Sequence, residues 1–342
     1  MKHFLRRFWI ALLALAMLLT ASCQAAGGDS AAPADGIYTP DEFYYAGGTG
    51  KARFSCPQIR LENGEAWALL TVDSKNYTYF KVDDVIYETT VEDGSAGAEI
   101  PVRLNAVTTV TGQTTAMSQP HEITYQIYVY LAAAGEDDTP DELRLPGLTL
   151  TGQEENRAAA LFAIARYEGG FALLTLKDGP RYLIVPEETE APALLPPDVL
   201  VIAEPVKAVY IGEEKLFDRL TEAAGEEAES VLTLAGFESD RAEFLGAFDD
   251  LNMAGLLKNG CSLALLPGVF ADPDLPEEDA KALQSEWDAL STFGVTPFPD
   301  LSDREETELG SLEWLRAYGL LLGREESFDA AFEQLAQEVE KK

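Results

Sequence analysis

The sequence predicts an α+β protein of more than one domain, in which an antiparallel β-sandwich precedes an α/β lobe. Apolar and polar residues alternate along 36–131, a period of two that is typical of strands. From 160 to 325, short apolar runs alternate with helical stripes, which indicates parallel strands connected by helices. The 342 residues are enough for two domains, and the charged, proline-containing segment 132–159 is expected to link them.

The N-terminus predicts export. Three basic residues precede an apolar run, 8–19, that is shorter than the roughly 20 residues a membrane-spanning helix needs. The run leads through small residues to Cys23 and resembles a bacterial lipobox, although Thr20 replaces the preferred leucine. We expect 1–22 to be a signal peptide, Cys23 to be lipidated and 23–35 to form a tether; ordinary secretion with Cys23 lost or free is the alternative.

The charge of the chain is strongly negative. Its 59 aspartates and glutamates outnumber 25 lysines and arginines, which gives a formal net charge of −34. Such a chain excludes nucleic acid as a partner, since a polyanion would be repelled. Anionic lipid headgroups would repel it as well, so we expect the lipid on Cys23 to attach the protein to the extracytoplasmic face of the cell membrane.

The residues of common catalytic and metal sites are scarce. His121 is the single histidine after the predicted signal peptide, and Cys56 and Cys261 lie in different regions beside strand-like runs. These two cysteines are expected to be buried free thiols rather than a disulfide. No zinc motif, Ser-His-Asp set or GxGxxG motif occurs in the lobe. We therefore predict neither an enzyme nor a metal site.

The β-sandwich module, 36–131, is expected to be immunoglobulin-like. Asn63-Gly64 is a hairpin signal, and turn residues recur at short intervals with no helical stripe between them. The expected strands include 52–54, 66–72, 79–82, 100–104 and 123–131. Residues 46–51 imitate a phosphate-binding loop, but Ala52 stands where Ser or Thr would hold magnesium and a strand follows, so a β-turn is predicted.

Residues 116–128 resemble the end of a NEAT domain, the immunoglobulin-like module of haem-uptake proteins. In that family two tyrosines four residues apart on the last strand face the haem. Here no second tyrosine follows Tyr125 by four residues, while Tyr128 and Tyr130 point to the opposite face. The resemblance implies a haem site at His121 and Tyr125; the alternative is that the tyrosines pack at the edge of the sandwich.

The α/β lobe, 160–325, begins with a predicted hairpin, 171–176 and 182–185. Further strands are expected at 199–202, 208–211, 231–234, 262–266 and 295–298, and helices at 213–224, 240–248, 251–258 and 277–290. The apolar character of these strands predicts a mostly parallel sheet that helices cover on both faces.

The sequence ends in two predicted amphipathic helices. Their apolar stripes are Leu309, Leu312, Leu315 and Leu322, and then Phe328, Phe332, Leu335 and Val339 within 326–342. The short joint between the stripes permits an antiparallel hairpin, so the second helix is expected to lie back on the first.

Three stretches of the lobe resemble substrate-binding lipoproteins of ABC importers for iron complexes and cobalamin. They are the pattern Leu-Gly, Glu-Trp, Tyr-Gly and Leu-Leu-Gly along 309–323, and the segments 167–171 and 181–186. The resemblance implies a preceding β-module, one lobe of the helical-bridge substrate-binding-protein fold, and 326–342 as the bridge-like helix. It also implies an iron complex, haem or cobalamin-type ligand and an ABC permease as partner. Because no second lobe follows in this sequence, the function is expected to be degenerate.

The ligand of such a lobe is expected at the loops that follow the parallel strands, where helix N-termini offer unpaired N–H groups. The loop residues are Glu213, Glu214, Lys215, Phe237, Pro267, Gly268, Phe270, Asp300 and Arg304. Since the first loop is acidic, a neutral or cationic ligand is favoured over an anionic iron–siderophore. The alternative is a cell-surface interaction protein that binds its ligand, haem included, through the β-sandwich while the lobe supports it.

Overall fold

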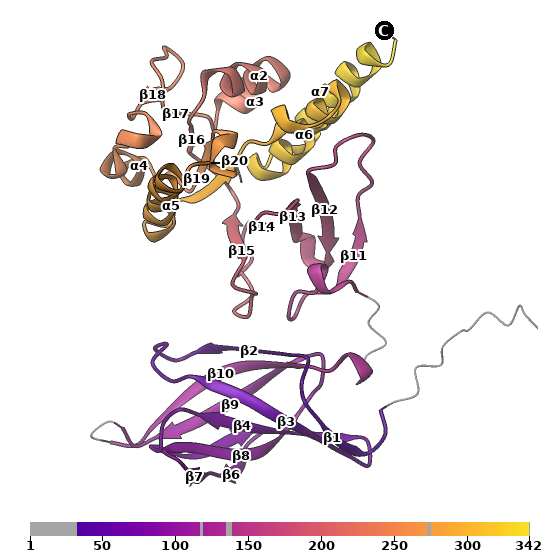
Figure 1. Cartoon of the computed structure of the whole chain (residues 1–342), viewed down its shortest axis with the longest axis vertical. Coiled ribbons are helices and arrows are strands. Elements are labelled where there is room, and N and C mark those ends of the chain that lie inside the picture. The colour runs from indigo at the N-terminus through magenta and orange to yellow at the C-terminus, as the bar shows by residue number, and fades with distance from the viewer. Residues whose placement is uncertain (1–32, 117–118, 135–138, 272–274, 342) are drawn as a thin grey trace, which may run out of the picture.

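The computed structural model describes residues 33–116, 119–134, 139–271 and 275–341, and Figure 1 shows their arrangement. The predicted signal peptide, Cys23 and most of the predicted tether lie outside the described residues. The described chain is an α+β protein whose N-terminal region is rich in strands, as predicted. No helix among the described residues is long and apolar enough to cross a membrane.

Two antiparallel five-stranded sheets form the N-terminal region. One has the order β1-β3-β4-β8-β7, with β1 (Gly36–Tyr38), β3 (Phe54–Glu62), β4 (Glu65–Val72), β8 (Ser95–Val102) and β7 (Thr90–Glu92). The other has the order β2-β10-β9-β5-β6, with β2 (Glu42–Gly47), β10 (His121–Tyr130), β9 (Val107–Thr114), β5 (Tyr77–Val82) and β6 (Val85–Glu88). Neighbouring strands run antiparallel throughout both sheets, which confirms that part of the prediction.

The core of the sandwich follows from the alternation along its strands. Inward-facing residues such as Leu70 of β4 and Phe80 of β5 are fully buried and belong to one apolar cluster. Asn63 and Gly64 have φ of 53° and 81° and close the predicted hairpin between β3 and β4, where both turn residues need positive φ.

Both cysteines of the described chain are free and buried, as predicted. Cys56 lies in the sandwich core and Cys261 in a core of the second region. Burial raises the pKa of each thiol to about 11, so both stay protonated at neutral pH. The two thiols therefore behave as small apolar side chains.

Part of the segment expected to be a linker packs on the second region. After the short turns η1 (Ala132–Ala134) and η2 (Asp141–Leu143), Leu143 and Leu145 join an apolar cluster on the first sheet of that region. The strand β11 (Leu150–Gln153) is the edge strand of the same sheet. It was not predicted because its four residues are mostly polar and its pairing contains a register shift.

The first sheet of the second region is mixed. Its order is β11-β12-β13-β14-β15, with β12 (Phe162–Tyr167), β13 (Ala172–Leu176), β14 (Arg181–Val185) and β15 (Val199–Ala203). Neighbours pair antiparallel except β14 and β15, which run parallel. The predicted hairpin is confirmed as β13 and β14, with Asp178 at a positive φ of 56° in its turn.

The second sheet is parallel throughout. Its order is β18-β17-β16-β19-β20, with β18 (Glu243–Phe244), β17 (Leu234–Ala235), β16 (Val209–Ile211), β19 (Leu263–Leu266) and β20 (Thr296–Pro299). The connections contain α2 (Glu214–Ala224), α3 (Glu226–Glu229), η4 (Phe248–Asp250), α4 (Met253–Lys258), η5 (Gly268–Ala271) and α5 (Glu277–Thr292), and η6 (Ser302–Arg304) follows β20.

The prediction of a single mostly parallel sheet is wrong, because the strands divide between these two sheets. An apolar strand buried on both faces has the same sequence pattern whichever sheet it joins and in whichever direction it pairs. The helix predicted at 240–248 is also wrong: this stretch holds β18 and the start of η4, and its few apolar residues do not build a helical face.

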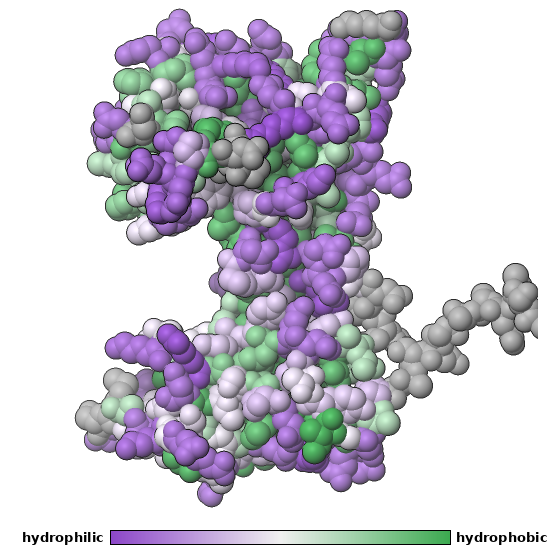
Figure 2. All heavy atoms as spheres, viewed as in Figure 1, coloured by the Kyte–Doolittle hydropathy of each residue, from purple (hydrophilic) through white to green (hydrophobic). Residues whose placement is uncertain are grey.

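Helices cover both faces of the parallel sheet, as predicted. On one face Tyr210 of β16 packs with Leu256 of α4 and Leu290 of α5. On the other face Ile211 and Phe217 of α2 belong to the largest apolar cluster, which also includes the terminal helices. Figure 2 shows hydrophilic residues spread over both regions on the visible face, in keeping with the net charge of −34.

The terminal helices α6 (Glu308–Leu322) and α7 (Glu325–Val339) form the predicted hairpin. Gly323, at φ 64°, ends α6 in the left-handed conformation. A Cβ on Gly319 would lie 2.8 Å from the Cβ of Phe328, so this glycine lets the two helices approach closely. Phe328 and Phe332 are buried, and α7 therefore lies back on α6.

Candidate functional site

The four predicted ligand loops meet at one edge of the parallel sheet. Parallel strands end at the same edge, and here β16, β17, β19 and β20 are followed by 212–215, 236–237, 267–268 and 300–304. We call these residues the loop edge. It is the surface at which open α/β sheets usually bind ligands.

Glycines allow the loops of the loop edge to touch. A Cβ on Gly236 would lie 2.4 Å from the Tyr210 hydroxyl oxygen and 3.2 Å from the carbonyl oxygen of Gly212. A Cβ on Gly268 would lie 2.4 Å from the carbonyl oxygen of Asp300. A Cβ on Gly268 would collide with backbone and one on Gly236 with the hydroxyl of the buried Tyr210, so larger residues at these two positions would displace their neighbours.

Asp300 is held in one orientation. Its Oδ1 accepts hydrogen bonds from the backbone N–H of Ser302, at 2.8 Å, and from the Tyr318 hydroxyl of α6. Tyr318 is fully buried, and burial followed by the negative charge of Asp300 raises its pKa well above the ordinary value. The phenol therefore stays protonated and, as a hydrogen-bond donor, fixes the position of the carboxylate.

Glu213 adds a second carboxylate at the start of α2. Partial burial is the largest cause that raises its pKa, and the nearby carboxylates of Asp300 and Asp303 raise it further, while Lys215 lowers it. A carboxylate in this position is stabilised by an added positive charge, because a cation offsets repulsion from the other two.

The two basic residues of the loop edge already have partners there. Lys215 pairs with Asp303, although both side chains are largely exposed, at 75% and 62%. Arg304 donates from Nη2 to the carbonyl oxygen of Gly268 at 2.9 Å. The acids at 213, 300 and 303 thus outnumber the bases, which gives the loop edge the negative character expected from its sequence.

Of the remaining predicted ligand residues, two pack against neighbouring residues and one has an exposed side chain. Phe237 packs its ring edge-on against Phe217 of α2, with centroids 5.7 Å apart, and Pro267 lies against the backbone of Gly212. Glu214 is exposed at the first turn of α2. The backbone of Phe270 lies in η5, and its side chain lies outside the described part of the structure.

The predicted haem residues face different environments. Tyr125 is 3% exposed inside the sandwich, and its hydroxyl oxygen lies 2.6 Å from that of Tyr77. His121 is exposed at the beginning of β10. Tyr128 and Tyr130 point away from the sandwich core, as predicted, and pack with Leu194 of the second region. The structure therefore does not bring His121 and Tyr125 to one open surface.

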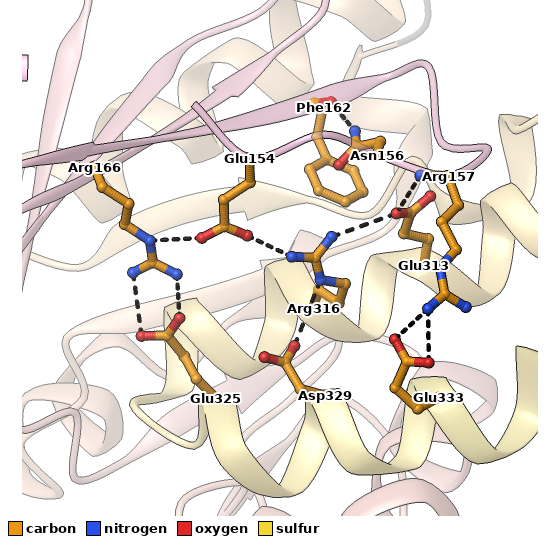
Figure 3. Close-up of polar contacts among 10 residues, drawn as sticks. All are labelled: Glu154, Asn156, Arg157, Phe162, Arg166, Glu313, Arg316, Glu325, Asp329 and Glu333. Atoms are coloured by element: carbon orange, nitrogen blue, oxygen red, sulfur yellow. Dashed lines mark hydrogen bonds and ion pairs between the residues drawn. The ribbon is translucent and has the colours of Figure 1, made fainter. Parts of the chain in front are cut away.

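Sequence reasoning missed the ion-pair network between the mixed sheet and the terminal helices, which Figure 3 shows. Glu154 near β11 pairs with Arg166 and Arg316, and Arg166 also pairs with Glu325 of α7. Glu313, fully buried on α6, was missed as well. The available signal was its place among the apolar residues of a terminal helix, where an unpaired carboxylate would be costly.

No protein-family model, curated protein or solved structure matches this chain. Within the described residues, no group of three or more His, Cys, Asp or Glu side chains is arranged to hold a metal ion.

Proposed function

We propose that the chain is an extracytoplasmic solute-binding protein of an ABC importer, anchored by a lipid on Cys23, whose ligand contacts the loop edge. The single observation that supports this proposal is the convergence of the four loops at the carboxyl edge of the parallel sheet. The proposed ligands are those implied by the sequence resemblance: an iron complex, haem or a cobalamin-type molecule.

The charge at the loop edge favours a cationic or neutral member of this group. Glu213, Asp300 and Asp303 lie close enough for the last two to raise the pKa of the first. An anionic complex would meet these carboxylates and a chain of net charge −34, so its association would be disfavoured.

The affinity is expected to be modest. Lys215 and Asp303 expose most of their side chains, so the loop edge contacts a ligand from one side and leaves much of it in water. Tight small-molecule sites instead bury most of the ligand surface. We expect dissociation constants on the order of 1 μM or weaker.

Calorimetry with haem, cobalamin, a cationic ferric hydroxamate and an anionic ferric catecholate tests the proposal. We expect the cationic complex to bind best and Glu213→Gln to weaken it by about threefold to tenfold, because one attractive charge is lost. Glu226→Gln is the matched control, since it removes the same charge from an exposed position of α3. Equal binding by wild type and Glu213→Gln would contradict a role for the loop edge, and nanomolar binding would contradict the expected open geometry.

The alternative of haem binding by the sandwich gains no support from the contacts of its tyrosines. His121 and Tyr125 do not share one open surface, and Tyr128 and Tyr130 pack with Leu194 of the second region. We therefore assign the proposed importer ligand to the loop edge.

A further inference from the structure

A hollow at one end of the β-sandwich has the properties of a ligand site. Its volume of about 550 Å³ falls within the roughly 300–1,000 Å³ of small-molecule pockets. It lies beside the loop between β2 and β3 and is lined, among others, by Lys51, Asp73, Ser74, Tyr77, Thr114 and Tyr125. We call it the tyrosine hollow.

The wall of the tyrosine hollow includes the segment that imitates a phosphate-binding loop. As predicted, this segment is a turn followed by a strand. A Cβ on Gly47 would lie 2.6 Å from the carbonyl oxygen of Thr124, and one on Gly48 would lie 3.0 Å from the Tyr125 hydroxyl oxygen. The two glycines, both at positive φ, let the loop lie directly on β10.

The paired tyrosines leave one hydroxyl proton without an acceptor. Tyr77 and Tyr125 are 5% and 3% exposed, and their hydroxyl oxygens lie 2.6 Å apart. Each hydroxyl carries one proton, and the contact between them uses one of the two. No other hydrogen bond of these hydroxyls occurs among the described residues, so the second proton is a buried donor beside the hollow.

A ligand oxygen in the hollow could accept this proton and so form a hydrogen bond with the pair. Burial, the largest cause, and the contact with Tyr77 raise the pKa of Tyr125, so the Tyr125 phenol stays protonated at physiological pH.

Further donors surround this pair. The Thr114 hydroxyl accepts from the backbone N–H of Ala116 at 3.2 Å, and the Ser74 hydroxyl accepts from that of Asn76 at 3.3 Å. Neither hydroxyl donates to another described residue, and Lys51 forms no ion pair within the described chain. The hollow therefore offers hydroxyl and ammonium protons to a ligand that is rich in oxygen.

The tyrosine hollow also has an acceptor and balanced charge. Asp73 uses Oδ1 to accept from the backbone N–H of Arg53 at 2.8 Å, and its second carboxylate oxygen remains available among the described contacts. The charges of Lys51 and Asp73 offset each other. Asp73 would repel an anion and Lys51 would repel a cation. A neutral ligand with both O–H donors and oxygen acceptors is repelled by neither. Ile123 and Ala52 supply apolar wall for its C–H groups.

We propose that the tyrosine hollow binds a neutral polyhydroxylated ligand, a sugar or the end of a glycan. The hydroxyl pair of Tyr77 and Tyr125 donates to one sugar oxygen, Lys51 donates to another, and Asp73 accepts from a sugar hydroxyl. This site lies in the sandwich, so it is separate from the proposed ligand surface at the loop edge.

Saturation-transfer NMR with glucose, galactose, mannose and N-acetylglucosamine on the full chain, together with ³¹P NMR for inorganic phosphate, tests the proposal. We expect at least one of these sugars to bind with a dissociation constant of about 1 mM, and inorganic phosphate not to bind. The double variant Tyr77→Phe/Tyr125→Phe should weaken sugar binding by about tenfold or more, because it removes both hydroxyls. Each single variant should weaken it less, since one donor remains.

A second pair of variants changes exposed lysines, so its result does not depend on whether the double tyrosine variant folds. Lys51→Ala changes an exposed side chain of the hollow and should weaken sugar binding by about threefold to tenfold. Lys177→Ala changes an exposed lysine in the turn between β13 and β14 and should leave binding unchanged. Absence of binding by all four sugars, binding of phosphate alone, equal binding by a folded double variant, or equal effects of the two lysine variants would overturn the proposal.

Discussion

The β-sandwich and the terminal helices are attached to the mixed sheet by contacts of different size and chemistry. The sandwich contact, which we call the sandwich junction, consists of Glu42, Tyr128, Tyr130, Arg144 and Leu194. The contact of the terminal helices, which we call the helix seam, combines the largest apolar cluster with the ion pairs of Figure 3.

The sandwich junction depends on one buried arginine from the connecting segment. The guanidinium carbon of Arg144 lies 3.7 Å from the ring centroid of Tyr130, and Nη1 lies 3.5 Å from Glu42. The same side chain donates to Asp141 and to the carbonyl oxygen of Thr139, while its buried Nε has no partner among the described residues. Arg144 thus lies in the connecting segment, between two leucines that pack on the mixed sheet, and covers the outer face of the sandwich.

The helix seam is held by backbone donors as well as by ion pairs. The buried carboxylate of Glu313 accepts from the backbone N–H groups of Arg157, Ala158 and Ala159 at 2.7–2.9 Å. Glu305 accepts from those of Ala160 and Leu161 in the same way. Two carboxylates, one on α6 and one just before it, therefore accept from the five backbone N–H groups of 157–161, which ties the segment before β12 to the start of α6.

The comparison indicates that α6 and α7 are an integral part of the second region, whereas the sandwich is attached as a module. Removing apolar area and buried carboxylates from the helix seam should unfold the second region, while weakening the sandwich junction should free one folded body from another. Three measurements test this distinction.

The largest effect is expected for Glu313→Ala. This change leaves three backbone N–H groups unpaired in a buried position and removes a partner of Arg316, so we expect the second region to lose about 3–5 kcal/mol of unfolding free energy. Chemical denaturation measures the loss.

Glu333→Ala is the matched control for Glu313→Ala. Glu333 is a glutamate of the adjacent helix α7 that pairs with Arg157, but both side chains are about half exposed, at 50% and 43%. We expect a much smaller loss, because water already solvates this pair. Losses of similar size for the two variants would contradict the role assigned to the buried carboxylate.

An intermediate effect is expected for Arg144→Ala. It removes the contact with Tyr130 and the ion pair with Glu42, and we expect a loss of about 1–2 kcal/mol together with faster proteolysis of the connecting segment. Arg60→Ala is the control, because Arg60 lies 5.4 Å from the Trp67 ring and pairs with two glutamates within a single sheet. Unchanged proteolysis in Arg144→Ala would show that the junction does not depend on this side chain.

The same two regions show which features of the fold the sequence patterns could predict. Regular alternation predicted the antiparallel sandwich, and the short joint between the two terminal apolar stripes predicted that α7 lies back on α6. The pattern failed for α6, where Leu309 and Leu312 are only partly buried although Gly310, Glu313 and Trp314 are buried, because this helix has neighbours on most sides.

The loops of the candidate site were predicted because strands that alternate with helices indicate parallel pairing, and parallel strands end at the same edge of a sheet. Their packing depends on close approaches at Gly236 and Gly268 and on the buried Tyr318, which belongs to a distant helix. The tyrosine hollow joins residues from β5, β9 and β10 and the loop after β2, so no local pattern could reveal it.

The smallest expected effect is the pH dependence of stability, which has opposite signs near the two contacts. Near the helix seam, burial and then the carboxylates of Glu325 and Glu187 raise the pKa of Glu204 above its ordinary 4.5. Near the sandwich junction, the hydrogen bond from Arg181 lowers the pKa of Asp198 below its ordinary 3.8. The stability due to Glu204 is complete below about pH 4.5 and is lost as pH rises through its folded pKa, whereas that due to Asp198 is present above about pH 3.8 and is lost as pH falls through its folded pKa.

Calorimetric unfolding at pH 7, 5 and 3 can separate these two groups. Acidification from pH 7 to 5 should raise the unfolding temperature of the second region, and Glu204→Gln should reduce that rise because an uncharged amide replaces the group that gains a proton. Acidification from pH 5 to 3 should weaken the contact of Arg181 with Asp198, whose guanidinium partner also donates to the carbonyl oxygen of Glu142 in the connecting segment. Asp198→Asn should therefore reduce the pH dependence in this lower range alone. If Glu204→Gln left the response between pH 7 and 5 unchanged, relief of the general negative charge would account for it, and the pH response would no longer distinguish the helix seam from the sandwich junction.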